Sequence, residues 1–340
     1  MGNAIMVDLL GSNLALISST SFLNVANELE KSNVIFIMGA TATGKTDLAI
    51  EIAQRFPVEL ISVDSALIYR DMDIGTAKPN AEVLSANPHF LVDIIDPADH
   101  YSAWDFVNDT KQLVEEITNR GNMPLLVGGT MMYFHALEQG LNQLPIADQS
   151  IRSQLNSEAE VVGWQAMHKK LEAIDSLSAE KIKPNDSQRI QRALEVFQIS
   201  GQTLSSLQRI KSINNHINAT KFILNVEDRQ HLHKRIEQRF NLMLQNGLVE
   251  EVEKLKNRPD LDLNKPSMRC VGYRQVWQYL ASQLNYDEMI FKSVVATRQL
   301  AKRQMTWLRK QPQKNNYDCL NLRHKKTKDA IFRGLSSLFF

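Results

Sequence analysis

Continuous apolar runs alternate with amphipathic stretches over the first half of the chain. The run at Val34–Met38 predicts a strand that is buried on both faces of a sheet, and Glu59–Asp64 and Pro124–Val127 predict two further strands. The stretches Asp47–Arg55 and 103–120 have the apolar spacing of helices, and each lies between two of these strands. Strands joined by helical crossovers predict a parallel α/β sheet flanked by helices.

The pattern changes after Leu144 and Pro145. Residues 146–210 have helical spacing and no strand-like run, and Lys221–Val226 then restores one. We therefore expect an all-helical insertion within the α/β core. The predicted organisation is a poorly ordered extension at 1–30, a core at 31–145 and 219–315, an insertion at 146–218, and a peripheral tail at 316–340.

Composition narrows the class of protein. The 340 residues include 39 basic and 38 acidic side chains, a net charge of +1, which excludes a polycationic tail and an acidic disordered chain. Two cysteines are too few for a disulfide scaffold and fit a reducing cytosol, so we expect a cytoplasmic protein. No window approaches the length of apolar sequence that spans a bilayer, and the first thirty residues lack the basic region of a secretory signal.

A phosphate-binding motif follows the first predicted strand. The pattern G-x-x-x-x-G-K-[ST] is matched by Gly39, Ala40, Thr41, Ala42, Thr43, Gly44, Lys45 and Thr46. Backbone amides of such a loop and the following helix N-terminus surround an anion. Lys45 would add a charge, and the Thr46 hydroxyl would be a ligand for Mg²⁺. The motif favours a kinase or NTPase, but a diphosphate on another molecule would satisfy the same amides.

Asp64 ends the second predicted strand, at the sheet edge that also carries the phosphate-binding loop. Ligands of open α/β sheets bind at the carboxyl ends of the strands, so we expect Asp64 to face the phosphate site. There it could bind Mg²⁺ or accept a proton from a nucleophile. A capping or turn role is the alternative for an isolated aspartate.

Several sequence blocks together resemble the tRNA dimethylallyltransferase family. They are the phosphate-binding loop, Ser62–Arg70, Met72–Pro79, Leu126–Thr130, Pro184–Asp186 with Gln188 and Arg189, Arg269–Arg274 and Lys302–Arg309. They occur in order from about residue 34 to residue 310. The resemblance implies a P-loop NTPase-like fold in which a prenyl diphosphate replaces the nucleotide. It also implies transfer of the dimethylallyl group to the N6 amine of the adenosine 3′-adjacent to the tRNA anticodon.

The resemblance assigns three catalytic residues. Asp64 would accept the proton of the amine, Thr130 would hydrogen-bond the reacting adenine, and Arg239 would neutralise the leaving diphosphate with Mg²⁺ as cofactor. Arg235 lies one helical turn before Arg239, and spacing alone does not distinguish the two arginines.

Cations that could bind RNA are concentrated near the end of the chain. Residues 292–310 contain six basic and no acidic side chains, which leaves 33 basic and 38 acidic residues elsewhere. A solvated surface is the ordinary interpretation of such a cluster, and the resemblance favours the anticodon stem-loop of tRNA instead. The residues that it assigns to tRNA are Asp64, Ser65, Ala66, Leu67, Thr130, Arg152, Gln188, Arg189, Ile190, Gln191, Arg192, Arg269, Cys270, Val271, Gly272, Tyr273, Arg274, Lys302, Arg303, Gln304, Met305, Thr306, Trp307, Leu308 and Arg309.

Two other functions account for part of these features. A P-loop kinase of a small metabolite explains the loop and Asp64 but leaves the basic segments without a role. A nucleotide-regulated RNA-binding module explains the cations but not the carboxylate at the strand end. We expect a monomer, since no stretch has the heptad pattern of a coiled coil.

Overall fold

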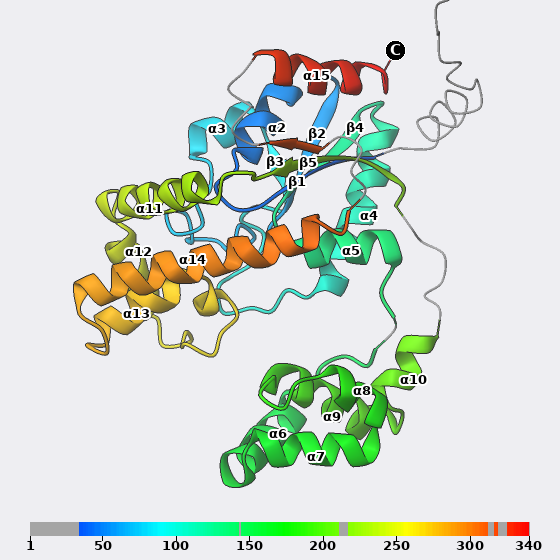
Figure 1. The fold of residues 1–340 in the computed structure, drawn as a ribbon, viewed down its shortest axis with the longest axis vertical. Coiled ribbons are helices and arrows are strands. Elements are labelled where there is room, and N and C mark those ends of the chain that lie inside the picture. Colours follow the sequence, from blue (N-terminus) through cyan, green and yellow to red (C-terminus); the bar gives the residue numbers. More distant parts are fainter. Residues whose placement is uncertain (1–33, 143, 211–216, 312–315, 319–324, 340) are drawn as a thin grey trace, which may run out of the picture. The chain divides into compact units, whose positions relative to one another are not determined.

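The computed structural model describes residues 34–142, 144–210, 217–311, 316–318 and 325–339. The extension predicted at 1–30 lies outside the described residues. The chain divides into two compact units (Figure 1). The P-loop unit comprises the described parts of 1–99, 113–129 and 218–340, and the helical unit comprises those of 100–112 and 130–217.

A six-stranded parallel sheet forms the centre of the P-loop unit. Its strands are β1 (Val34–Gly39), β2 (Val58–Val63), β3 (His89–Phe90), β4 (Met123–Gly128), β5 (Ala219–Asn225) and β6 (Asn316–Asp318). They lie in the order β3-β2-β4-β1-β5-β6, which confirms the predicted parallel α/β fold. Gly128 pairs with both Met38 and Val63, so β1, β2 and β4 end at the same edge.

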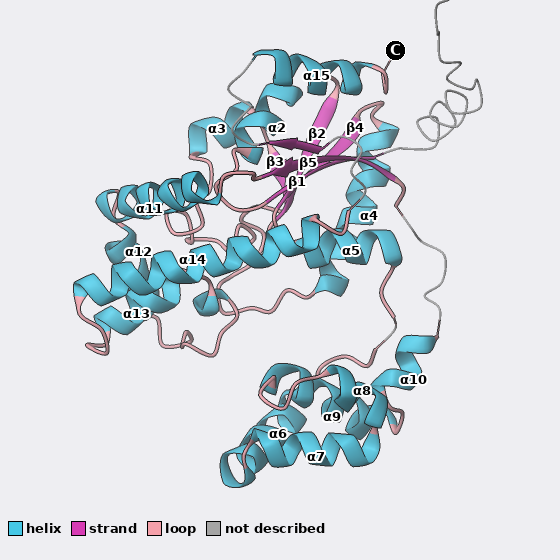
Figure 2. Ribbon diagram, in the orientation of Figure 1, coloured by secondary structure: helices cyan, strands magenta, loops and turns pink. Residues whose placement is uncertain are grey.

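Helices cover both faces of this sheet (Figure 2). The helices that belong wholly or partly to the P-loop unit are α2 (Lys45–Ala53), α3 (Ala81–Ala86), α4 (Ala103–Asn119), α11 (Arg229–Gln245), α12 (Leu248–Lys256), the 3₁₀ turn η1 (Ser267–Arg269), α13 (Tyr273–Leu280), α14 (Tyr286–Leu308) and α15 (Lys325–Ser336). Apolar side chains of α2 and α15 pack on Ile35, Val127 and Phe222. Helix α14 contacts β1 and β5 and packs with α11 and α13.

The carboxyl-terminal segment differs from the predicted peripheral tail. Strand β6 pairs with β5, and Ile331 and Leu335 of α15 are fully buried against the sheet. This segment is rich in Lys and Asn, which conceals the apolar face that α15 presents every three to four residues. The described parts of 316–340 therefore belong to the core of the P-loop unit.

The helical unit has a separate apolar core. Its helices besides part of α4 are α5 (Met131–Gln139), α6 (Gln149–Val162), α7 (Trp164–Ile174), α8 (Ser176–Lys181), α9 (Ser187–Ser200) and α10 (Leu204–Arg209). Leu155, Met167 and Ile190 are among the buried residues that α6, α7 and α9 contribute. Side chains of Asp148 and Asp186 accept hydrogen bonds from the first turns of α6 and α9, which explains where these helices begin. The unit is helical as predicted, but it includes 100–112 and begins its second segment at 130 rather than 146.

No helix within the described ranges combines the length and the apolar character that crossing a membrane requires.

Candidate active site

The phosphate-binding loop connects β1 to α2 through a tight turn. Gly44 immediately precedes α2 at φ 87°, and Ala42 also lies in the left-handed region at φ 64°. A methyl group at Gly39 would lie 2.8 Å from Thr43 Oγ1, so the turn closes too tightly there for a side chain. Non-glycine residues with positive φ are uncommon and cluster in ligand-binding loops. The backbone therefore has the tight, strained form expected of a phosphate-binding loop.

Two polar side chains fold over this loop. Thr43 Oγ1 and Lys45 Nζ each donate to the carbonyl oxygen of Ala40, both at 2.8 Å. The ammonium group of Lys45 thus lies at the loop itself. This position suits the predicted role of a positive charge beside a bound phosphate.

Asp64 directly follows β2 at the shared edge of the sheet. Its Oδ1 accepts a hydrogen bond from the backbone N–H of Ala66 at 2.9 Å, and this small turn fixes the carboxylate. The charge of Asp64 acts on two neighbouring groups, Arg239 and the thiol of Cys270. Burial, with a contribution from Asp64, raises the pKa of Cys270 to about 12, so this thiol stays protonated near neutral pH.

Arg239 connects helix α11 to the phosphate-binding loop. Its Nη2 donates to Thr41 Oγ1 at 2.6 Å. Burial lowers the pKa of Arg239, the charge of Asp64 opposes this shift, and the nearby charge of Arg235 adds to it. A guanidinium keeps its charge under all such conditions. Arg239 is therefore the arginine of α11 that hydrogen-bonds to the loop, and the charge of Asp64 acts on it.

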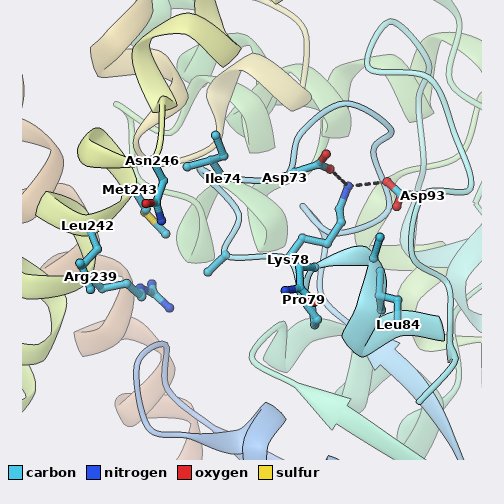
Figure 3. A pocket seen from close by; sticks show the side chains of 13 residues that line it. Asp73, Ile74, Lys78, Pro79, Leu84, Asp93, Arg239, Leu242, Met243 and Asn246 are labelled. Carbon is cyan, nitrogen blue, oxygen red and sulfur yellow. Dashed lines mark hydrogen bonds and ion pairs between the residues drawn. The ribbon is translucent and has the colours of Figure 1, made fainter. Parts of the chain in front are cut away.

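A cavity of about 600 Å³ opens beside Arg239 (Figure 3). Helix α11 forms one wall, and the segment between β2 and α3 forms the other with Ile74, Lys78 and Pro79. The Lys78 ammonium donates to Asp73, to Asp93 and to the carbonyl oxygen of Tyr69, so its charge is already balanced within the wall. Arg239 is consequently the cation of this cavity that extends toward the phosphate-binding loop.

Glu251 of α12 holds the middle of the segment between β2 and α3. Its carboxylate accepts from the backbone N–H groups of Asp73, Ile74 and Gly75 at 3.0, 2.7 and 3.1 Å, and from the hydroxyl of Tyr273. A methyl group at Gly75 would overlap the Tyr273 ring at 2.4 Å. The sequence contains no signal for Glu251, because its backbone partners lie more than 170 residues earlier in the chain.

The protein oxygens near the phosphate-binding loop fit a magnesium ion that is held mainly by the oxygens of a bound phosphate group and only partly by the protein. The described residues contain no group of three or more His, Cys, Asp or Glu side chains that could hold a metal. Mg²⁺ commonly takes one or two protein oxygens and completes its shell with phosphate oxygens and water. Thr46 in the first turn of α2 and Asp64 at the strand end offer a hydroxyl and a carboxylate. The role of Thr46 stays a prediction.

The residues assigned to tRNA in the P-loop unit differ in their exposure to solvent. Arg269, Arg274 and the outer residues of the block at 302–309 are exposed, as an RNA-binding surface requires. The outer residues are Lys302, Arg303, Thr306, Trp307 and Arg309. Tyr273 is 0% exposed, and Met305 and Leu308 are also buried. The contact with tRNA that the resemblance assigns to Tyr273 does not agree with a buried ring that is enclosed against Gly75.

The helical unit shows the same division. Gln188 and Arg189 are exposed, whereas Ile190 is fully buried. Arg152 and Arg192 both donate to Glu195, whose side chain is 0% exposed. Burial would raise the pKa of Glu195, but the hydrogen bonds from the two arginines lower it below its usual value. These two arginines balance a buried charge inside the unit.

Thr130 begins the second segment of the helical unit, directly after Gly129, and precedes α5. Its predicted contact with the reacting adenine stays a prediction.

The fold and the site together define a class. A phosphate-binding loop after β1, a carboxylate after β2 at the same edge of the sheet, and an arginine that contacts the loop and feels the charge of that carboxylate characterise a P-loop protein that acts on a phosphorylated ligand. An ordinary strand-turn-helix connection would not bring these three groups together.

Comparisons with known proteins identify the family within that class. A model of the IPP transferase family matches residues 67–311, and a model described as isopentenyl transferase matches 32–94. A tRNA isopentenylpyrophosphate transferase structure from Bacillus halodurans is similar at 34% identity and a TM-score of 0.66, covering 91% of this chain and 97% of that one. This chain belongs to the IPP transferase family.

Two further solved structures agree with this assignment. The tRNA delta(2)-isopentenylpyrophosphate transferase of Staphylococcus epidermidis is 30% identical, with a TM-score of 0.65 and coverage of 90% and 99% of the two chains. A eukaryotic dimethylallyltransferase acting on tRNA is 25% identical, with a TM-score of 0.74 and coverage of 89% and 77%. The matches confirm the family resemblance of the sequence blocks and do not support a metabolite kinase or a non-catalytic RNA-binding module.

Proposed function

We propose that this protein transfers the dimethylallyl group of dimethylallyl diphosphate to a tRNA. The acceptor is the N6 amine of the adenosine 3′-adjacent to the anticodon, and the second product is diphosphate. Family membership supports this activity. The observation that carries the proposal is the hydrogen bond from Arg239 to Thr41, because it joins a cation within reach of Asp64 to the phosphate-binding loop.

The chemistry needs a base and a site for the leaving group. A bond forms between N6 and the first carbon of the dimethylallyl group while the bond from that carbon to the diphosphate oxygen breaks. Asp64 accepts the proton that N6 loses. Loop amides, Lys45 and Arg239 stabilise the negative charge that accumulates on diphosphate. Mg²⁺, when bound near Thr46, would supply further positive charge to the diphosphate oxygens.

Binding of tRNA is proposed to use the exposed residues of the assigned blocks. These are Gln188, Arg189, Arg269, Arg274, Lys302, Arg303, Thr306, Trp307 and Arg309. The anticodon stem-loop supplies phosphates for the cations and unstacked bases for Trp307. An adenine that is to transfer its N6 proton to Asp64 must leave its stack, as other base-modifying enzymes require. We propose that the enzyme acts as a monomer in the cytoplasm.

The activity is tested with labelled dimethylallyl diphosphate, Mg²⁺ and unmodified tRNA in the absence of ATP. Label should enter the tRNA, and it should not enter a tRNA in which guanosine replaces the adenosine beside the anticodon. If the tRNA with guanosine at this position takes up as much label as the unmodified tRNA, the proposed acceptor is wrong. If no label is transferred but phosphate moves from added ATP, the protein is a kinase.

The role of Asp64 as proton acceptor is tested with Asp64→Asn. Asparagine keeps the side-chain oxygen that accepts a hydrogen bond from the backbone N–H of Ala66. We expect the rate of transfer to fall about 10²- to 10⁴-fold while tRNA affinity stays near that of the wild type. Asp71→Asn is the matched control, since Asp71 is exposed in the same segment and its φ of 62° is tolerated by Asn. Single-turnover rates equal to the wild type would remove Asp64 from the mechanism.

A further inference from the structure

Gln304 lies on the inner side of α14, within a segment whose neighbours face solvent. Lys302 and Arg303 precede it and are exposed, whereas the side chain of Gln304 is partly buried. The family resemblance gives one role, contact with tRNA, to this whole segment. The contacts of Gln304 indicate a different one.

The side-chain amide of Gln304 both accepts and donates a hydrogen bond at the edge of the sheet. Its Oε1 accepts from the backbone N–H of Thr41 in the phosphate-binding loop at 2.9 Å. Its Nε2 donates to the carbonyl oxygen of Gly129, just beyond the end of β4, at 2.8 Å. One side chain thus ties the loop after β1 to the end of the neighbouring strand. Only a carboxamide supplies a donor and an acceptor in this planar arrangement.

Thr41 is held from two sides as a result. Gln304 fixes its backbone, and Arg239 donates to its hydroxyl. Any shift of the Thr41 backbone would move the hydroxyl that orients Arg239. The arrangement therefore links the position of the inner face of α14 to the cation proposed for the leaving diphosphate.

The absence of a side chain at Gly129 leaves space for the amide nitrogen of Gln304. A methyl group there would lie 2.6 Å from Gln304 Nε2, and its next neighbour would be the carbonyl oxygen of Gly39 at 3.4 Å. The obstacle to a side chain at Gly129 is thus chiefly the end of Gln304, so an alanine would displace the amide without entering the core.

We propose that Gln304 is a positioning residue of the diphosphate site, acting through Thr41 and Arg239, and that it does not contact tRNA. The identity of the ligand rests on the proposed function. The positioning role itself rests on the hydrogen bonds of Gln304 and on the space at Gly129.

The primary test compares Gln304→Met with Gln299→Met. Both residues lie on α14, and the Gln299 side chain is exposed. Methionine keeps the length of glutamine but can neither accept from Thr41 nor donate to Gly129. We expect the affinity for magnesium pyrophosphate, measured by calorimetry, to fall about tenfold in Gln304→Met, the size expected for the loss of two ordinary hydrogen bonds. Gln299→Met should bind pyrophosphate like the wild type.

Kinetics separate positioning from a general structural effect. In Gln304→Met the KM for dimethylallyl diphosphate should rise about tenfold, in proportion to the pyrophosphate affinity, while the KM for tRNA stays unchanged. Gly129→Ala keeps the glutamine at position 304 but displaces its amide group, so it should reproduce the defect. The double variant should be no worse than the weaker-binding single variant, because both changes break the same contact. If Gln304→Met fails to fold, Gly129→Ala alone carries the comparison.

Two results would overturn the proposal. One is a Gln304→Met protein that binds pyrophosphate like the wild type but has a raised KM for tRNA, which would make Gln304 an RNA contact. The other is a fully additive loss in the double variant. Pyrophosphate binding needs neither tRNA nor prenyl transfer, so it is measurable even if the proposed activity is wrong, and the two failures remain distinguishable.

Discussion

Arginines occupy two contrasting environments in this protein. Arg239 of the P-loop unit is partly buried and donates to the neutral hydroxyl of Thr41 at the phosphate-binding loop. Arg152 and Arg192 of the helical unit converge on the buried carboxylate of Glu195. The family resemblance gives all three a functional role. The structure separates them, because a cation bound to a hydroxyl keeps charge for a ligand, whereas one bound to a buried carboxylate has already used it.

Among the variants that test this difference between the arginines, Arg239→Gln should lose the most activity. Glutamine keeps a polar side chain at this position but is shorter than arginine and carries no charge for the diphosphate. We expect kcat/KM for dimethylallyl diphosphate to fall about 10²- to 10³-fold, in the range for removal of one charge-stabilising group from an active site. Steady-state kinetics with tRNA held at saturation measure the loss.

Arg235→Gln is the matched control, one helical turn earlier on α11. It should reduce kcat/KM by less than tenfold, since Arg235 acts on the site through its charge, whereas Arg239 makes the hydrogen bond to the loop. Equal losses in the two variants would show that the helix provides only a diffuse positive field. The geometric argument for Arg239 would then fail.

The corresponding change in the helical unit is Glu195→Gln. It removes the charge that Arg152 and Arg192 share, and we expect it to destabilise the folded unit by about 2 kcal/mol. This figure lies below the usual range for a broken buried pair because both arginines retain some access to water. Urea unfolding followed by circular dichroism measures the change, with the exposed Glu172 as Glu172→Gln for comparison.

The pH dependence of unfolding provides an independent test of the same cluster. Burial opposes and the arginines favour the charged form, and the net result is a pKa of Glu195 below its value in the unfolded chain. The carboxylate therefore stabilises the unit above the unfolded pKa, and this contribution is lost as pH falls through the lower folded value. The stability difference between wild type and Glu195→Gln should shrink over that interval. A difference that does not change with pH would contradict the assignment.

Local sequence patterns predicted the parts of the fold and site that depend on neighbouring residues. The strands β1, β2 and β4 are apolar runs, and the phosphate-binding loop is a contiguous motif, so both are visible in the sequence. Strand β3 has only two residues, and α15 lies in a Lys-rich stretch, so neither gives a clear signal. The roles of Glu251 and Gln304 depend on partners more than 170 residues away.

The resemblance located functional segments without resolving the two faces of each helix. Within 302–309, Arg303 faces solvent while Gln304 and Met305 face inward. Within 188–192, Arg189 is exposed while Arg192 bonds to Glu195. A helix turns about 100° per residue, so adjacent positions in one block serve a surface and a core. Only the tertiary structure assigns each residue to one of them.

The smallest expected effect concerns the salt dependence of tRNA binding, and it compares exposed Arg303 with paired Arg192. Arg303→Gln should reduce the slope of log affinity against log salt by about 0.7 to 0.9, the contribution of one phosphate contact. Arg192→Gln should leave the slope unchanged, because its guanidinium is committed to Glu195 and to the carbonyl oxygen of Pro145. Filter binding at several salt concentrations, under conditions where both variants remain folded, gives the slopes. A reduced slope for Arg192→Gln would mean that the Glu195 cluster opens when tRNA binds, and the division between structural and RNA-binding arginines would then hold only for the free protein.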